Sequence, residues 1–209
     1  MVSQGKQHGI SSRRNIYRNM GGNIPNTPKL VETEIPLGLT LISWNINGLC
    51  ENGPNTMEKF DTLRRAVGAW DPNFILLQEM HGRKNMAEVL RAEIPRYIWI
   101  MILERRGYRG VAIGVKHDKR TVLPIPPPEI DEHGRWMILP ITFMREKIVL
   151  TSIYKPDKTP REFWAQLCGR LGERIAIIGG DFNARPESSE MTEILECLVG
   201  KNISLVPSK

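Results

Sequence analysis

The sequence predicts an α/β fold: a two-sheet β-sandwich flanked by helices, with four layers in the order α/β/β/α. Two observations lead to this expectation. Apolar strand-like runs alternate with segments of helical periodicity, and several of the strand-like runs lie close enough in sequence to form hairpins. The hairpins do not fit a regular series of βαβ units, so two sheets packed face to face are the better interpretation. The 209 residues are enough for one sizeable core.

The first elements follow from runs of apolar residues. A strand is expected at residues 39–44. A helix comes next, because apolar side chains recur on one helical face at Phe60, Leu63, Val67 and Trp70. Residues 71–73, with a central proline, end this helix. Residues 74–78 form a short, mostly apolar strand that stops at Glu79.

The middle of the chain predicts one helix and one hairpin. The helix covers about residues 84–92, and strands at 97–103 and 110–115 are joined by a charged turn. An irregular loop follows, because prolines cluster at Pro124, Pro126, Pro127 and Pro128.

The last third predicts a second hairpin, from strands at 136–144 and 148–154. A helix is expected at about 160–171, and a buried strand at 175–178 leads into two glycines and Asp181. The glycines are expected to let the backbone turn tightly. A final helix, starting at Ser188 or Ser189, is indicated by apolar side chains at Met191, Ile194, Leu195 and Leu198.

Residues 1–37 are expected to form a disordered basic arm, and residues 38–209 the folded domain. Most of the net charge of +6 lies in residues 1–31, which hold no acidic residue and carry Lys6, Arg13, Arg14, Arg18 and Lys29. With little periodic hydrophobicity, the arm has no face to bury. A solvated tail, a nucleic-acid-binding arm and a mitochondrial targeting segment all fit this composition.

The cysteines and the hydropathy indicate an intracellular protein. Cys50, Cys168 and Cys197 are far apart, so they form neither a metal-binding pattern nor a disulfide framework. No apolar run is long enough to span a membrane, and the N-terminus lacks a secretory signal. We expect no membrane association and a nuclear location, with the mitochondrion as the alternative.

Polar side chains gather where the expected strands end. They are Asn45, Asn47, Glu79, Tyr154, Asp181 and Asn183. If the strands pack side by side, a Glu and an Asp come together with amides between them. Such an oxygen-rich site without Cys or His suits a hard cation, Mg²⁺ or Mn²⁺. The chemistry that this indicates is metal-assisted attack on a phosphodiester.

Taken singly, these residues have simpler interpretations. Glu79 can be a solvated strand end, Asp181 and Asn183 part of a plain turn, and Tyr154 a packed aromatic with a solvated hydroxyl. The order and spacing of all of them together favour a functional site.

Five segments, "SWNINGL", "LLQEMH", "GVAIGV", "SIYKPD" and "GGDFNA", resemble the motifs of the endonuclease/exonuclease/phosphatase superfamily in the same order. The resemblance covers about residues 39–199. It is closest to the apurinic-type endonuclease domain of non-LTR, LINE-like retrotransposons, in which "NINGL" and a Gln-Glu-x-His segment are typical. It implies a metal-dependent nuclease that acts on DNA or RNA.

The resemblance assigns roles to the residues on the first two strands. Glu79 matches the metal-binding glutamate of the family. Asn47 matches a position near the metal, often an aspartate elsewhere in the superfamily. Asn45 matches an asparagine that orients the phosphate-binding site and its acids.

It also assigns roles to the residues of the later strands. Asp181 matches the aspartate that positions or deprotonates the attacking water, and Asn183 its phosphate-orienting partner. Tyr154 matches a tyrosine that contacts the scissile phosphate.

The sequence departs from the family in two places. Arg109 replaces the first glycine of a Gly-Gly pair. No Ser-x-x-Asp or Ser-Asp-His segment follows Asn183, and the four histidines, His8, His81, His117 and His133, all precede it. His81 is expected to have an exposed rather than a catalytic role. We therefore expect a domain incomplete at its C-terminal side, inactive alone, with a sheet edge for a protein partner or a missing C-terminal segment to cover.

Basic residues surround one expected hairpin. They are Arg105, Arg106, Arg109, Lys116, Lys119 and Arg120, against only Glu104 and Asp118. One interpretation is a charged edge that prevents aggregation. The other is a patch that contacts nucleic-acid phosphates, principally through Arg105, Arg106 and Arg109.

The leading hypothesis is a Mg²⁺-dependent phosphodiesterase, a DNA endonuclease domain of the LINE-like retrotransposon type. The alternative is a retrotransposon-derived, non-catalytic remnant that serves as a nucleic-acid-binding or structural subunit. A phosphatase or deadenylase of the same superfamily is a third hypothesis.

Overall fold

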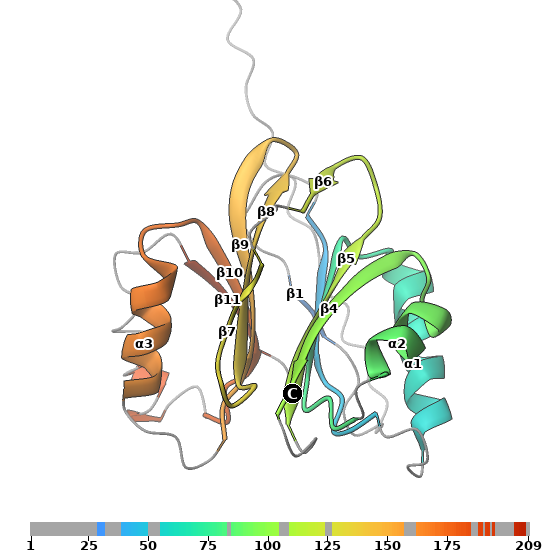
Figure 1. Ribbon diagram of the computed structural model, residues 1–209, viewed down its shortest axis with the longest axis horizontal. Helices are drawn as coiled ribbons and strands as arrows, with labels where there is room; N and C mark the ends of the chain where they lie inside the picture. The colour runs from blue at the N-terminus through green and yellow to red at the C-terminus, as the bar shows by residue number, and fades with distance from the viewer. Residues whose placement is uncertain are drawn as a thin grey trace, which may run out of the picture.

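The structure, a computed structural model, describes residues 29–31, 39–49, 55–82, 85–104, 109–123, 127–156, 162–184, 188–189, 191–192, 194 and 203–207, with 29–31 and 203–207 described by their backbone. Two β-sheets pack face to face, and helices cover their outer surfaces (Figure 1). This arrangement confirms the predicted α/β/β/α sandwich.

The first sheet has five strands in the order β1-β2-β3-β5-β4. Their bounds are β1 Lys29–Val31, β2 Leu41–Asn45, β3 Phe74–Gln78, β4 Tyr97–Leu103 and β5 Gly110–Lys116. β2 and β3 run parallel, and β5 is antiparallel to both β3 and β4. Two helices, α1 (Thr56–Trp70) and α2 (Met86–Glu93), lie on the outer face of this sheet (Figure 1).

The second sheet has six strands, with the path β11-β10-β9-β8-β6 and β7 paired beside β8. Their bounds are β6 Thr121–Val122, β7 Glu129–Ile130, β8 Trp136–Phe143, β9 Glu146–Tyr154, β10 Ala176–Asp181 and β11 Ile203–Pro207. β9 and β10 run parallel, whereas β8 and β9 form a hairpin. The helix α3 (Glu162–Leu171) covers the outer face (Figure 1).

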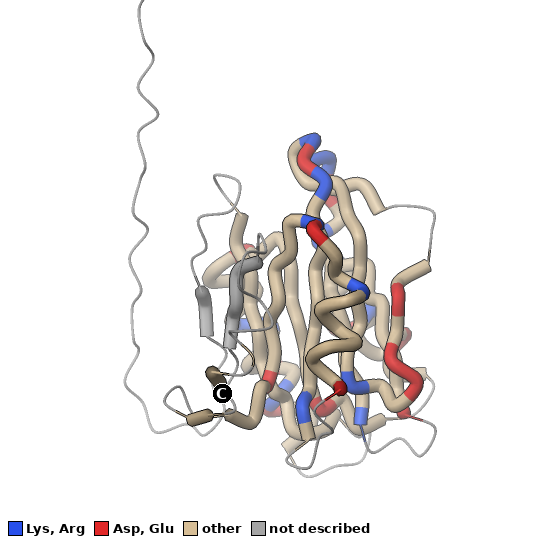
Figure 2. Tube along the Cα trace, turned by 90° about the vertical axis from the view of Figure 1, so that its left-hand side faces the viewer, with Lys and Arg blue, Asp and Glu red and all other residues tan. Residues whose placement is uncertain are grey.

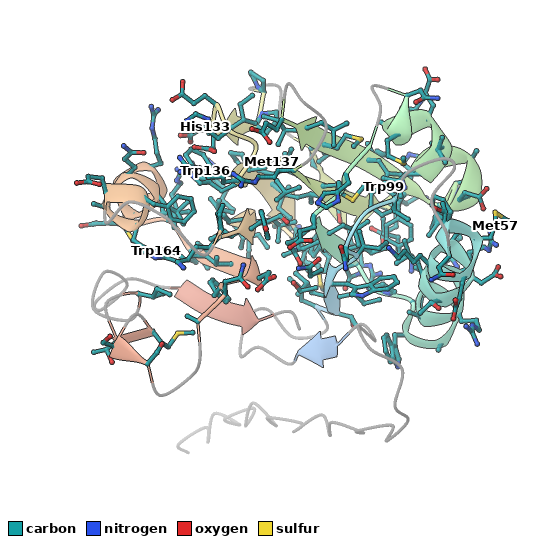
Figure 3. The ribbon with its side chains drawn as sticks, turned by 90° about the horizontal axis from the view of Figure 1, so that it is seen from below. Met57, Trp99, His133, Trp136, Met137 and Trp164 are labelled. Carbon is teal, nitrogen blue, oxygen red and sulfur yellow. The ribbon has the colours of Figure 1, made fainter. Side chains whose placement is uncertain are left out.

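Three apolar clusters hold the four layers together. One lies between the first sheet and its helices, a second between the two sheets, and a third between the second sheet and α3. Figure 3 shows Trp99 on the side of α2, and Trp136 and Trp164 on the side of α3. All five residues of β3 are buried because neighbouring strands flank it and apolar layers cover both of its faces. Each fully buried aliphatic or aromatic side chain contributes about 1.5–3 kcal/mol.

Most expected elements are found within a residue or two of their predicted bounds, and both hairpins form. Ser188 accepts a hydrogen bond from the Met191 backbone through its hydroxyl (3.1 Å), as a helix N-cap does. β11 and the short β6 and β7 were not predicted. The arm expected to be disordered needs one correction, because Lys29–Val31 pair with β2; the rest of residues 1–37 lies outside the described residues.

None of the described helices has the length and apolar character needed to cross a membrane.

Candidate active site

The polar residues of the predicted site lie at one end of both sheets, the lower end in Figure 1. In the first sheet, the parallel register sets Asn45 beside Gln78, the residue before Glu79. In the second sheet, the parallel register sets Asp181 beside Tyr154. The ends of four strands therefore meet where the two sheets face each other.

Asn45 connects the acids of the two sheets. Its side-chain amide nitrogen donates to Glu79 Oε1 (3.1 Å) and to Asp181 Oδ2 (2.6 Å). Its Oδ1 accepts the backbone N–H of Asn47 (3.0 Å). An amide can do this because it has both donors and an acceptor, whereas a carboxylate would repel both acids. The two carboxylate oxygens lie within two hydrogen-bond lengths of each other.

The backbone of Glu79 is in the left-handed region, with φ of 52°. This conformation is uncommon for a residue with a long side chain, and here hydrogen bonds on both sides fix it. The Glu79 carbonyl accepts from Gly48 N (2.7 Å), and the next residue, Met80, donates to Gly110 O (3.1 Å). Asn47 and Asn183 also have positive φ, 47° and 43°. The strand ends thus turn sharply and direct short polar segments into one region.

Asp181 and Asn183 are held by the segment that follows β9. Asn183 N donates to Asp181 Oδ1 (3.0 Å), and Asn183 Nδ2 donates to the Lys155 carbonyl (2.5 Å). Lys155 N in turn donates to the Asp181 carbonyl (2.9 Å). These bonds fix the end of β10 against the end of β9.

The two glycines before Asp181 have a different role from the predicted tight turn. Both lie inside β10, where the chain packs closely against its neighbours. A Cβ on Gly180 would lie 2.0 Å from Ile153 O, and one on Gly179 would lie 2.5 Å from Leu76 Cδ1. Glycine is required at position 180, because the Ile153 backbone leaves no room for a side chain, whereas at position 179 the end of the Leu76 side chain would have to shift.

Tyr154 contributes a protonated hydroxyl to the site. Its pKa is raised to about 12, first by burial and then by the negative charge of Glu79 and a hydrogen bond to that carboxylate. Asp181 acts in the same direction, and the positive charge of Arg109 opposes it. The hydroxyl therefore stays a hydrogen-bond donor at neutral pH.

A buried polar network behind the site connects the two sheets. Gln78 Nε2 lies 3.1 Å from Ser152 Oγ and 3.5 Å from Ser43 Oγ, and the Ser152 hydroxyl donates to the Leu77 carbonyl (3.2 Å). Ser43, Gln78 and Ser152 lie one or two residues before Asn45, Glu79 and Tyr154 on the same strands. The network thus fixes the strands that carry the site.

The donor set fits a hard cation. Glu79 and Asp181 supply carboxylate oxygens, and no Lys or Arg ion pair to either of them is found in the described part of the chain. No group of three or more His, Cys, Asp or Glu side chains comes together among the described residues. A cation here would therefore complete its shell with water or ligand oxygens, as Mg²⁺ usually does.

Asn47, predicted near the metal, has described contacts through its backbone: its N–H bonds Asn45, and its carbonyl accepts from Lys59 Nζ (2.5 Å). The same ammonium group bonds the Gly48 carbonyl (2.8 Å) and so holds the turn after β2. The sequence analysis missed this role of Lys59, which sits twelve residues later on α1.

His81 also lies closer to the site than expected. Its Nε2 is 3.8 Å from Glu79 Oε2, and about a third of its side chain is exposed. The "QEMH" segment was the signal that could have placed it there.

The six basic residues around the predicted hairpin do not all lie at the same end of the sheet, and the phosphate-contacting patch at Arg105, Arg106 and Arg109 stays a prediction. Arg109 lies at the site end of β5, where its charge acts on Tyr154, while Arg105 and Arg106 lie outside the described residues. Lys116, Lys119 and Arg120 lie at or beyond the other end of this strand. There Lys116 pairs with Asp71, and Arg120 pairs with Asp118. The seven paired residues of β5 therefore separate Arg109 from Lys116, Lys119 and Arg120.

A four-layer sandwich with an acid–amide cluster at one end of its sheets is the class of protein defined by this fold and site. The chain belongs to the endonuclease/exonuclease/phosphatase family, whose family model matches residues 42–200. A comparison with curated proteins found no significant match.

Several solved structures are similar in fold. D. rerio TDP2 complexed with a single-strand DNA product has a TM-score of 0.58 at 23% identity, covering 75% of this chain and 64% of that one. The endonuclease domain of TRAS1, a telomere-specific non-LTR retrotransposon, has a TM-score of 0.55 at 17% identity, covering 76% and 70%. A Bacteroides vulgatus endonuclease/exonuclease/phosphatase has 0.56 at 15% identity, covering 71% and 68%. This chain thus spans about two thirds of their lengths.

Proposed function

We propose that the site binds a divalent cation and the phosphodiester of a nucleic acid, as part of an endonuclease domain of the LINE-like retrotransposon type. The observation that carries the proposal is the hydrogen bonding of Asn45 to both Glu79 and Asp181. It brings two carboxylates together, and neither has a Lys or Arg ion pair among the described residues, a charge arrangement that a cation relieves. The nuclease likeness of the motifs and the DNA-bound fold neighbour support the choice of substrate.

Each residue has a definite task in this proposal. Glu79 and Asp181 would hold Mg²⁺, which when bound supplies positive charge to the phosphate oxygens. Asp181 accepts a proton from the attacking water, whose oxygen forms the new bond to phosphorus. The bond from phosphorus to O3′ breaks, and the departing O3′ oxygen takes up a proton from solvent, which gives a 3′-hydroxyl and a 5′-phosphate. The Tyr154 hydroxyl, a donor at neutral pH, hydrogen-bonds a phosphate oxygen.

We propose that these 209 residues cut DNA poorly on their own. The sequence holds no Ser-Asp-His segment to stabilise charge on the phosphate. Loss of one preorganised donor typically lowers the rate by roughly 10²–10³. The second candidate function is a non-catalytic nucleic-acid-binding subunit, in which the acid–amide cluster binds without cutting.

Thermal denaturation with and without Mg²⁺ tests the cation site apart from catalysis. We expect Mg²⁺ to raise the Tm of the wild-type chain and to have little effect on Glu79→Gln. Asp118→Asn, which removes a carboxylate from the opposite end, is the matched control and should keep the wild-type response. An undiminished Mg²⁺ effect in Glu79→Gln would refute the proposed cation site.

A supercoiled-plasmid nicking assay then separates the two functions. Weak nicking that Asp181→Asn abolishes supports the endonuclease. DNA binding that Asp181→Asn leaves intact, with no nicking by either protein, supports the binding subunit. Robust nicking abolished by Glu79→Ala would contradict the proposed low activity and show that another residue replaces the histidine.

A further inference from the structure

β4 forms an open, apolar edge of the first sheet. Among the described strands it pairs with β5 alone, and it lies at the front of the molecule in Figure 1. Its seven residues, Tyr97–Leu103, include no charged residue and no proline. Edges of other described strands follow the usual protective rules, since β1 and β6 have three and two residues and β11 ends in a proline.

The backbone direction along β4 can be read from its ends. The His117 N–H donates to the Arg96 carbonyl, and the Glu104 N–H donates to the Arg109 carbonyl, so the backbone groups of these two even-numbered residues face β5. Because donors alternate along an antiparallel strand, the intervening odd-numbered residues direct their N–H and C=O groups away from β5. Tyr97 N bonds the Ile94 carbonyl (3.3 Å), and Gly134 packs against the backbone at Glu104. The outward backbone groups that remain are centred on Trp99 and Met101.

We propose that β4 pairs antiparallel with β4 of a second copy of this chain, with the two-fold axis at Ile100. In this register Trp99 of each copy lies opposite Met101 of the other copy, and the two residues exchange backbone hydrogen bonds. Arg96 of one copy lies opposite Glu104 of the other, and Ile98 lies opposite Ile102. A shift by two residues loses both charge pairs, and a shift by one sets outward backbone groups against inward ones.

The side chains of this register complement each other on the face toward the second sheet and at the two ends of the pairing. Ile98, 38% exposed in the single chain, and the half-buried Ile100 meet isoleucines of the second copy on the face toward the second sheet. On the helix face the Trp99 side chain is buried, with its indole over Gly114 of β5, so the Trp99–Met101 pairing there is made by the backbone. The Arg96 side chain is 59% exposed and already pairs with Asp71 through Nη2, and its other guanidinium N–H groups can donate to a carboxylate from the second copy. Because the strands are antiparallel, the two candidate active sites face in opposite directions.

Sedimentation velocity over a wide range of protein concentration tests the pairing. We expect a concentration-dependent dimer, which Ile98→Lys weakens roughly tenfold or more by placing an ammonium group in the apolar contact. Ile175→Lys is the matched control, because Ile175 is also 38% exposed but lies beside the second sheet. Met101→Pro should also abolish the dimer while circular dichroism stays native, since it removes an outward N–H.

A charge exchange tests the register. Glu104→Arg alone and Arg96→Glu alone should each weaken self-association, because each sets like charges opposite each other. A mixture of the two variants should restore dimers close to wild-type affinity. A chain that is monomeric at every concentration would overturn the proposal. So would a dimer that resists both Ile98→Lys and Met101→Pro, because its interface would lie elsewhere.

Discussion

The two ends of the sandwich use the same residue types for opposite purposes. At the site end, Glu79 and Asp181 both bond to one neutral amide, that of Asn45. At the other end, acids are neutralised: Asp71 pairs with Lys116 and Arg96, and Asp118 with Arg120. Figure 2 shows basic and acidic residues intermixed at the tip of the β8–β9 hairpin, also at this far end. Acids paired with Lys or Arg contribute to stability, whereas the two acids bonded to a neutral amide can also accept a cation in the proposed function.

The largest loss of stability is expected from Gly180→Ala, at the closely packed end of β10 beside the site. Gly180→Ala sets a Cβ against the backbone oxygen of Ile153, which cannot move aside without breaking β9. We expect a loss of about 3 kcal/mol or more in the free energy of unfolding. The control is Gly169→Ala in α3, where a Cβ meets nothing within 4 Å and the change should stabilise by about 0.5–1 kcal/mol. Urea denaturation measures both, and equal effects would contradict this account of the glycines.

A third carboxylate at the site end should make this end less stable still, relative to the far end where the acids are paired with Lys or Arg. Asn45→Asp removes the amide donor and sets a negative charge beside Glu79 and Asp181. Without metal we expect destabilisation of about 2 kcal/mol or more, with Mg²⁺ recovering part of it. Denaturation with and without Mg²⁺ provides the measurement. A variant as stable as wild type in a chelator would show that the two acids do not depend on the amide.

A smaller effect should come from the bond between the sheets. Ser152→Ala leaves Gln78 Nε2 with Ser43 at 3.5 Å as its described contact, and we expect a loss of about 1–2 kcal/mol. A double-mutant cycle with Gln78→Leu should give a coupling energy of about 1 kcal/mol. Additive single effects would mean that this hydrogen bond does not connect the sheets energetically.

The smallest effect is expected at the neutralised end. The hydrogen bond from Lys116 lowers the pKa of Asp71, so its stabilising contribution is present above the unfolded pKa of about 4 and is lost as pH falls through the lowered value. Because Asp71 is more than half exposed, Asp71→Asn should cost at most a few tenths of a kcal/mol at neutral pH. Denaturation at several acidic pH values should show a slightly shallower loss of stability in the variant. A large effect at neutral pH would contradict the comparison of the two ends.

Local patterns predicted much of the fold and the grouping of the site. The apolar run of β3 and the hairpin of β4 and β5 are set by residues near each other in sequence. Strand ends predicted that Asn45, Glu79 and Asp181 would meet, as their hydrogen bonds show, although their catalytic roles stay predictions. The packing role of Gly180 depends on contact between separate strands, which no local pattern reports.

The same limit explains the errors. The basic residues from Arg109 to Arg120 were grouped because they are close in sequence, but the length of β5 sets Arg109 at one end of the sheet and Lys116 to Arg120 at the other; the patch at Arg105, Arg106 and Arg109 stays a prediction. β11 pairs with β10 across an intervening segment, so its partner could not be inferred from neighbouring residues.

The hydrogen bond from Asn45 to Asp181 has a consequence for the order of folding. Asn45 is 34 residues from Glu79 but 136 residues from Asp181. Ribosomes add about 5–20 residues per second, so Asp181 is synthesised on the order of ten seconds after Asn45. Contacts of such long range also form late, because closing the intervening loop costs entropy before the contact is gained. The proposed cation affinity, which requires both acids, would therefore arise only once the second sheet has docked, and metal binding during synthesis would report on the completion of folding.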